Sequence, residues 1–260
     1  MTGGAVELHC QLDGSPDGPA LLLGGSLGTT LAMWEPQVSG LSAIARLVRF
    51  DHRGHGLSPV ADGPYEIADL GRDVLALMDR LELERVSYCG LSIGGMVGQW
   101  LAINAPERIE RLILICTAPH LPPASSWQQR AEAVRSAGTP EVVADAVIGR
   151  WFTPPFAERN PELVARHREM IVATPAEGYA GCCEALAGLD VRAGLPGIAA
   201  PTLVIAGAQD PSIPPEHGRA IAAAVPGARF ELLDPGAHLS SVERADVVTE
   251  LIAGHLRGAR

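Results

Sequence analysis

The stretch "RVSYCGLSIGGMVGQWLA", from Arg85 to Ala102, changes its hydrophobic pattern in the middle. It begins with strand formers and ends in a helical pattern, so a strand should turn directly into a helix. Ser92 stands at the change, and Gly90 and Gly94 flank it in "GLSIG", which fits the pattern G-x-S-x-G. Such a sharp turn strains the backbone, leaves no room for bulky neighbours and exposes the hydroxyl at the carboxyl end of the sheet. The pattern predicts a nucleophilic serine, with a phosphate-binding loop or a simple tight turn as the alternatives.

Two backbone N–H groups are candidates for stabilising a negative oxygen beside this serine. Ile93 follows Ser92 and opens the predicted helix, where a free N–H can meet an anion. The second donor should come from a loop after an earlier strand, and "LLLGGSLGTT" supplies a glycine-rich turn there. We assign this donor to the N–H of Ser26, with Leu27 as the alternative. A turn that merely ends a strand is the competing interpretation of this stretch.

A serine hydroxyl needs a base, and a histidine oriented by a carboxylate is the usual one. Of the eight histidines, His238 alone follows a late strand, in the small-residue loop "PGAHLSS". Asp210 follows the strand "PTLVIAG", so it should lie at the same edge of the sheet as the serine and the histidine. Asp190 and Asp234 are weaker candidates, because the first precedes that strand and the second closes the next one. Serine, acid and histidine then occur in the order typical of this kind of site.

Short apolar runs alternate with helical patterns along much of the chain. They predict strands buried on both faces, as in a parallel sheet, and they read "ALLLGG", "RLVRFD", "RVSYCG", "RLILIC", "PTLVIAG" and "RFELLD". Between the second and third runs, apolar residues step by three and four along one helix face: Ile67, Leu70, Val74, Leu77 and Leu81. The first residues, "VELHCQLDG", favour an antiparallel hairpin at the edge of the sheet. These patterns together predict an α/β fold.

The alternation lapses between Pro119 and about Pro196. This region contains two tryptophans, several prolines and short helical patterns such as "SWQQRAEAVRSAG" and "PEVVADAVIGRW". We expect residues 119–196 to form a helical insertion over one end of the sheet. Residues 1–118 and 197–260 would then form the core of a single domain.

The composition excludes several classes of function. The net charge of −10 disfavours nucleic acid and anionic membranes as partners, so we expect a small molecule. All twenty basic residues are arginines, which excludes a Schiff-base lysine and a Gly-Lys-Ser/Thr phosphate loop. The N-terminal segment has no basic start and no apolar run, and no later segment is long and apolar enough to span a membrane, so we expect a cytoplasmic protein. The five cysteines lack the spacing of a zinc site or a disulfide framework.

The stretch "DHRGHGLS", Asp51 to Ser58, contains two histidines three residues apart. His52 and His55 could suggest a metal site, but no cluster of carboxylates or cysteines lies near them in the sequence. We therefore expect a structural loop and no metal. No nucleotide-binding pattern is present, and we expect no cofactor.

With these residues in view, the whole chain resembles the α/β-hydrolases, which commonly carry a D-x-R-G-x-G-x-S loop like that at Asp51 to Ser58. The resemblance implies a mostly parallel sheet flanked by helices, with a small helical cap inserted after the sixth strand. Five further stretches are similar to the 3-oxoadipate enol-lactonases, namely "SLGTT", "GLSIGGMVGQWLA", "RWFTPPF", "YAGCCEAL" and "PSIPPEHGRAIA". Many α/β-hydrolases read His-Gly where this chain reads "GGSLG"; the enol-lactonases also lack that histidine.

The narrower resemblance implies a cofactor-free hydrolase that opens 3-oxoadipate enol-lactone through an acyl-enzyme, in aromatic catabolism. A carboxylesterase, a perhydrolase or a carbon–carbon bond hydrolase of the same fold are the alternatives. A receptor that binds a small ligand without catalysis is a further one, although no member of the serine, acid and histidine set is lost. Ser92 argues against epoxide hydrolases and haloalkane dehalogenases, which have an aspartate as the nucleophile.

The implied lactone carries a carboxylate, so its pocket needs a cation, and arginine is the available permanent one. Arg150 is the first choice because it lies in "GRWFTPPF", where Trp151 could form a wall against the ring. Arg130, near Trp127 in "SWQQR", is the second choice. The competing interpretation of Arg150 is a solvated arginine paired with a surface carboxylate.

Overall fold

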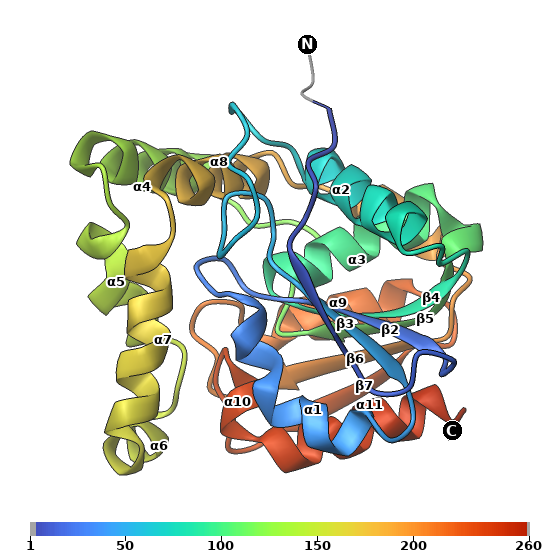
Figure 1. The fold of residues 1–260 in the computed structure, drawn as a ribbon. Helices are drawn as coiled ribbons and strands as arrows, with labels where there is room; N and C mark the ends of the chain where they lie inside the picture. The colour runs from blue at the N-terminus through green and yellow to red at the C-terminus, as the bar shows by residue number, and fades with distance from the viewer. Residues whose placement is uncertain (1–3, 259–260) are drawn as a thin grey trace.

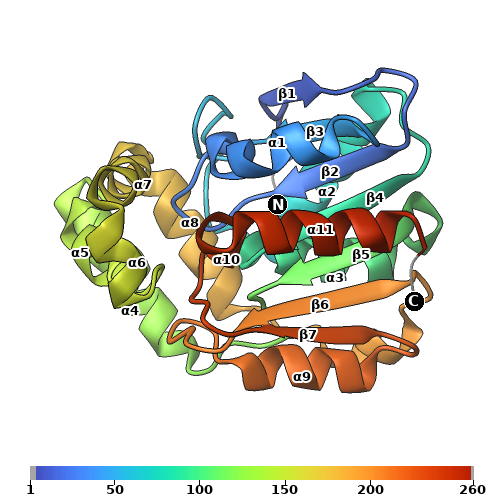
Figure 2. The same ribbon diagram turned by 90° about the horizontal axis from the view of Figure 1, so that it is seen from below.

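The computed structural model describes residues 4–258, and within them one seven-stranded sheet has the order β1-β3-β2-β4-β5-β6-β7 (Figures 1 and 2). All neighbouring strands run parallel except β1, which is antiparallel to β3. The strands are β1 (Cys10–Asp13), β2 (Ala20–Gly24), β3 (Arg46–Phe50), β4 (Val86–Leu91), β5 (Ile109–Ile115), β6 (Thr202–Gly207) and β7 (Arg229–Leu233). The six runs of strand formers are therefore confirmed as the six parallel strands.

Burial along the strands follows their position in the sheet. Every residue of β4 and β6 is buried, because helices cover both faces of the central strands. β7 was expected to be buried on both faces like the others, but only Leu233 in it is buried. β7 is the last strand of the sheet, and an edge strand has solvent on one side.

The N-terminal strand is antiparallel and lies at the edge of the sheet, as predicted, but the predicted hairpin is wrong. β1 does not pair with β2, which follows it in the chain, but crosses to the outer side of β3, where Cys10 lies opposite Phe50. β2 is almost wholly buried between two parallel neighbours, whereas β1 is half-exposed and suits an edge. Because the N-terminal segment contributes one strand, the helical insertion follows the fifth strand and not the sixth.

The helices form two layers on the sheet. α1 and α11 lie on one face, and α2 and α3 on the other, while α9 packs against β6 and β7 (Figures 1 and 2). Ile67, Leu70, Val74 and Leu77 of the predicted apolar stripe are confirmed on the buried face of α2, whereas Leu81 follows the helix and is only partly buried. The helices outside the insertion are α1 (Glu35–Leu41), α2 (Ile67–Arg80), α3 (Ile93–Asn104), α9 (Pro215–Ala224), α10 (Ser240–Glu243) and α11 (Ala245–Leu256), with 3₁₀ turns at Leu31–Trp34 and Pro106–Arg108. A further 3₁₀ turn, Arg192–Gly197, lies where the insertion returns to the core. None of the helices in the described part of the chain has the length and apolar character that a bilayer span requires.

Five helices lie between β5 and β6 and stand beside the sheet (Figure 1). Arg135 on the first of them forms ion pairs with Glu177 and Glu184 on the last, with distances of 2.7 and 2.5 Å, so the two helices are held together. These inserted helices are α4 (Ala124–Ala137), α5 (Glu141–Ile148), α6 (Pro154–Arg159), α7 (Pro161–Ala173) and α8 (Ala176–Ala187). The division into a core of 1–118 with 197–260 and a cap of 119–196 stays a prediction.

Candidate active site

Ser92 lies on the turn that joins β4 to α3, as the sequence predicts. Its backbone is strained, with φ 58° and ψ −119°, in a region that residues with a side chain rarely adopt. A Cβ on Gly90 would lie 2.2 Å from the carbonyl oxygen of Gly94, and one on Gly94 would lie 2.3 Å from that of Gly24. Both flanking positions therefore require glycine, the first so that the helix can approach the strand and the second so that it can approach the end of β2.

His238 and Asp210 form a buried pair. The Nδ1 atom of His238 lies 2.8 Å from Oδ2 of Asp210, and each residue is 3% exposed. The other carboxylate oxygen accepts hydrogen bonds from the backbone N–H groups of Ser212 and Ile213, at 2.8 and 3.0 Å. An ionised carboxylate only accepts, so Nδ1 carries the imidazole proton and Nε2 is left as a free acceptor.

The two weaker acid candidates lie elsewhere. Asp190 is exposed and pairs with Arg192 at 2.6 Å, and Arg192 holds the pKa of that carboxyl well below its usual range. Asp234 is exposed just after β7. Of the three carboxylates considered from the sequence, only Asp210 contacts His238.

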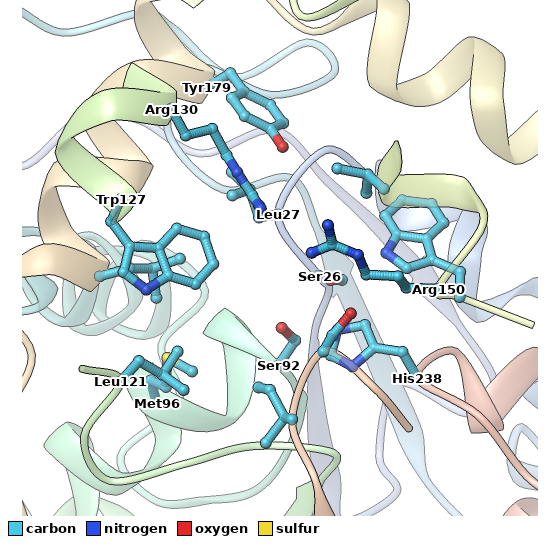
Figure 3. Close-up of a pocket in the computed structure, with 15 residues that line it drawn as sticks. Ser26, Leu27, Ser92, Met96, Leu121, Trp127, Arg130, Arg150, Tyr179 and His238 are labelled. Carbon is cyan, nitrogen blue, oxygen red and sulfur yellow. The ribbon is translucent and has the colours of Figure 1, made fainter. Parts of the chain in front are cut away.

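A cavity of about 80 Å³ opens above Ser92 and His238 (Figure 3). The sequence analysis singled out eight of the residues that line it: Ser26, Leu27, Ser92, Trp127, Arg130, Arg150, Trp151 and His238. Ile93 does not line the cavity; it is buried beneath the turn, at the first position of α3, where the N–H has no acceptor within the helix. The volume suits a few water molecules or one small ring, not a polymer, since one water needs roughly 10–15 Å³ on this measure.

The structure adds lining residues that the sequence analysis missed, namely Met96, Leu121, Val147, Tyr179, Leu186, Ser212 and Ile213. Among these residues, Tyr179 has a polar group in an unusual, fully buried environment. Its side chain is fully buried and its hydroxyl has no hydrogen-bond partner among the described residues. Burial raises the pKa of this phenol, against the opposite influence of the nearby Arg130 cation. The one signal in the sequence is its place in "YAGCCEAL", a stretch noted only for its similarity to other proteins.

The loop after β2 forms a tight turn beside the nucleophile. The N–H of Thr29 donates to the carbonyl of Ser26 at 3.1 Å, and Gly28 has a φ of 80°, which glycine adopts without strain. Within residues 4–258, neither Ser26 nor Leu27 has an acceptor for its backbone N–H. Both groups thus remain candidates for the second oxyanion donor, and the first stays our assignment.

The cavity has a positive lining. Arg130 on α4 stacks over the ring of Trp127, with its guanidinium carbon 4.7 Å from the ring centroid. Arg150 follows α5 and is exposed over much of its side chain, yet it also reaches the cavity (Figure 3). Across the described residues, neither arginine forms an ion pair with a carboxylate, and no Asp or Glu lines the cavity. The site therefore has two cations without a counterion.

The paired histidines of the "DHRGHGLS" stretch belong to a structural loop. His52 and His55 each bond to backbone of the turn after β2, at Gly25 and Gly28. In the part of the chain that the structure describes, no group of three His, Cys, Asp or Glu side chains is arranged to hold a metal ion.

Comparison with known proteins identifies the family. The model of the alpha/beta hydrolase fold family matches residues 19–245. The chain is 43% identical to the 3-oxoadipate enol-lactonase 2 of Acinetobacter baylyi, over 94% of this chain and 91% of that enzyme.

Two solved structures are similar to the chain over nearly its whole length. The enol-lactonase from Burkholderia xenovorans LB400 superposes with a TM-score of 0.93 at 44% identity, covering 96% of both chains. A thermophilic esterase from Thermogutta terrifontis, solved with malate bound, has a TM-score of 0.92 at 31% identity, covering 98% of this chain and 94% of the esterase. The chain belongs to the α/β-hydrolase fold family and is a homologue of the 3-oxoadipate enol-lactonases.

Proposed function

We propose that this protein is a serine hydrolase that opens a small carboxylated enol-lactone, converting 3-oxoadipate enol-lactone to 3-oxoadipate in aromatic catabolism. The observation that carries the proposal is the cavity in which Ser92 and His238 face two arginines that have no counterion among residues 4–258. A pocket with this charge favours an anionic substrate over a neutral ester. The name of the homologous 3-oxoadipate enol-lactonase from Acinetobacter supports the same substrate, and that of the enol-lactonase from Burkholderia supports the same class of reaction.

The proposed reaction uses the groups at the base of the cavity. Ser92 Oγ attacks the lactone carbonyl carbon while His238 Nε2 takes its proton, and Asp210 holds the imidazole in the required tautomer. The N–H groups of Ile93 and Ser26 stabilise the oxyanion. The ring C–O bond then breaks, and His238 returns the proton to the leaving enol oxygen.

A water molecule completes the turnover. It attacks the acyl-enzyme and gives its proton to His238, which passes it to Ser92 Oγ as the ester bond breaks. The released enol becomes the ketone in water. These residues supply nucleophile, base and oxyanion donors, so we expect turnover without a cofactor or a metal.

We propose that Arg150 binds the carboxylate arm of the lactone. It follows α5 directly before the buried Trp151, whose indole lines the same cavity and offers a wall to the ring. Arg130, stacked over Trp127, is the second candidate for the same carboxylate. The esterase from Thermogutta was solved with malate, a dicarboxylate, which is consistent with anion binding in proteins of this kind.

The test is a direct assay of 3-oxoadipate enol-lactone beside an uncharged butyrate ester. We expect kcat/KM to be much higher for the lactone. Arg150→Met should lower kcat/KM for the lactone by a factor that corresponds to about 2 kcal/mol of transition-state stabilisation, the size expected for a charge-assisted bond to an anion. It should leave kcat/KM for the ester nearly unchanged. Arg130→Met is the matched variant at the other arginine.

Three outcomes would overturn parts of this proposal. A higher kcat/KM for the butyrate ester would make the protein a carboxylesterase. Equal losses on both substrates in Arg150→Met would show damage to the inserted helices and not loss of an anion contact. A loss in Arg130→Met alone would transfer the carboxylate to Arg130.

A further inference from the structure

The loop between β3 and α2 contains two fully enclosed imidazoles that the proposed reaction does not use. His52 is 3% exposed and His55 is 1% exposed. Both rings contact the turn directly after β2, and this turn contains Ser26 and Leu27, the two candidates for the second oxyanion donor. The question is what two buried histidines contribute at this point.

His52 bonds to the first residue of the turn. Its Nε2 atom lies 3.2 Å from the carbonyl oxygen of Gly25, and since a carbonyl only accepts, this nitrogen carries the proton. The same carbonyl also accepts a hydrogen bond from the backbone N–H of Gly94, at 3.1 Å. Gly25 precedes Ser26 and Gly94 follows Ile93, so one carbonyl joins the two halves of the proposed oxyanion hole.

His55 bonds to the other side of the turn, in the opposite sense. The N–H of Gly28 donates to Nε2 of His55 at 3.0 Å, and Nδ1 of the ring lies 3.1 Å from the carbonyl oxygen of Arg53. Because Nε2 accepts, Nδ1 carries the proton and donates to that carbonyl. His55 therefore satisfies a buried N–H that no backbone group within the turn satisfies.

We propose that His52 and His55 are positioning residues that set the geometry of the oxyanion hole, by holding Gly25 and Gly28 on either side of Ser26 and Leu27. The inference rests on the hydrolytic function proposed above, but not on the identity of the substrate. Asp51 adds a third contact from the same loop, since its Oδ1 accepts from the N–H of Leu31 at 2.7 Å. Three backbone sites in and just after the turn, at Gly25, Gly28 and Leu31, are thus held by side chains of one short loop.

The role requires a neutral imidazole at His55, whose Nε2 accepts from Gly28, whereas Nε2 of His52 donates to Gly25 in either protonation state. Burial lowers the pKa of His52 to about 3, with a further contribution from His55, while the hydrogen bond to Gly25 acts in the opposite direction. Burial likewise lowers the pKa of His55, against the Arg53 carbonyl and the Asp51 carboxylate, which favour the protonated ring. At neutral pH, Nε2 of His55 is therefore free to accept from Gly28.

Glutamine and phenylalanine separate the hydrogen bond from the shape of the ring. Glutamine offers both an amide donor and a carbonyl acceptor near the position of Nε2, whereas phenylalanine fills the space and offers neither. Ser58→Ala is the matched control. Ser58 lies in the same loop and bonds to the backbone of Asp51 and to that of His9, just before β1, but not to the turn after β2. The substrate for the test is an uncharged chromogenic butyrate ester.

We expect His55→Phe and His52→Phe to lower kcat roughly 10- to 100-fold, less than the 10²–10³ measured when an oxyanion donor is deleted outright. KM should change little, since the turn acts on the transition state. The affinity for phenylboronic acid, which forms a tetrahedral adduct with the serine, should fall by a similar factor. The glutamine variants should recover most of kcat, and Ser58→Ala should keep it.

Several results would overturn the proposal. Phenylalanine variants that fold and keep wild-type kcat and boronate affinity would show that the histidines only fill space. Glutamine variants as impaired as the phenylalanine variants would show that the hydrogen bonds are not the cause. If the phenylalanine variants do not fold, His52→Asn and His55→Asn replace them, because the shorter asparagine side chain does not reach the turn. Unaltered kcat in these asparagine variants would also show that the hydrogen bonds of the histidines do not matter. A wild-type protein that a fluorophosphonate does not label would refute the serine mechanism itself, which distinguishes the two failures.

Discussion

Asp210 illustrates how the surroundings of a single side chain determine its chemistry. One oxygen contacts His238 and the other accepts two backbone N–H groups, so the carboxylate has a fixed orientation. A fixed carboxylate defines the tautomer of the imidazole, and the free Nε2 then faces the cavity. The position of the acid just after β6 follows from the sequence, but its two backbone partners follow from the turn that Ser212 and Ile213 make.

Asp210→Asn should lower kcat roughly 10⁴-fold, as the equivalent change does in serine proteases, because an amide can donate to Nδ1 and stabilise the wrong tautomer. The measurement is kcat for a chromogenic ester, with circular dichroism to show that the fold is intact. Asp190→Asn is the control, since this exposed carboxylate pairs only with Arg192 near it in sequence. Full activity in the Asp210 variant would assign the orienting role to another group.

Tyr179→Phe should increase the free energy of unfolding by about 1 kcal/mol. The buried hydroxyl makes no hydrogen bond of standard geometry to the described residues, and the Arg130 guanidinium near it is not aligned to satisfy it, so removing this polar group relieves its desolvation cost. Denaturant unfolding at neutral pH measures the change. A loss of stability in this variant would instead show that Arg130 satisfies the hydroxyl, directly or through an ordered water.

At the scale of elements, α10 connects the inserted helices to the loop that contains His238. Glu243 accepts hydrogen bonds from the hydroxyl and the N–H of Thr153, just before α6, and from the N–H of Ala237 at 3.0 Å. The N–H of Leu239 also donates to the carbonyl of Trp151 at 2.9 Å. Trp151, which lines the cavity, and the loop of His238, the proposed base, are therefore held by one short helix.

Glu243→Ala should lower the free energy of unfolding by about 2 kcal/mol, because it leaves buried donors at Thr153 and Ala237 without their charged acceptor. It should also lower kcat, since Ala237 adjoins His238. Glu243→Gln keeps one acceptor oxygen, so its free energy of unfolding and its kcat should lie between those of Glu243→Ala and the wild type.

Denaturant unfolding and ester turnover measure the two effects. Glu250→Ala, at an exposed position on α11, is the control and should change neither. Equal stability in Glu243→Ala and Glu250→Ala would show that the Glu243 link is not formed in solution.

At the scale of the whole molecule, buried histidines make the stability of the fold sensitive to acid. Burial lowers the pKa of five histidines from the ordinary value of 6.5: His52, His55, His167, His217 and His255. In the unfolded chain these groups take up protons at higher pH than in the folded protein. Well above pH 6.5 both states are neutral at these sites, and as the pH falls through 6.5 the unfolded state gains protons before the folded state does.

The free energy of unfolding should therefore fall as the pH drops below about 6.5, and the share of His52 should continue to fall until about pH 3. His52 alone contributes up to about 1.4 kcal/mol per pH unit in this range. Denaturant unfolding at pH 7.5 and pH 5.0 measures the slope. His52→Gln removes one of these groups and should give a shallower slope, and an unchanged slope would show that His52 titrates normally in the folded state.

Local patterns in the sequence determine much of this protein. The strand-to-helix turn at Ser92 requires Gly90 because of the backbone of Gly94 in the same turn, and the apolar runs and the stripe on α2 depend on spacing along one element. The order of serine, acid and histidine predicts which edge of the sheet they share. These features could be read from the sequence because each one depends on neighbours in the chain.

Other features depend on the approach of segments that are far apart in the chain, and only the tertiary structure decides them. β1 pairs with β3 because β2 is already enclosed by parallel neighbours. Tyr179 joins the cavity because α8 packs on α4, and His52 and His55 meet the turn after β2 because β3 lies beside it. No local pattern encodes such contacts, since hydrogen bonding and burial depend on distances in space that the packing of whole elements determines.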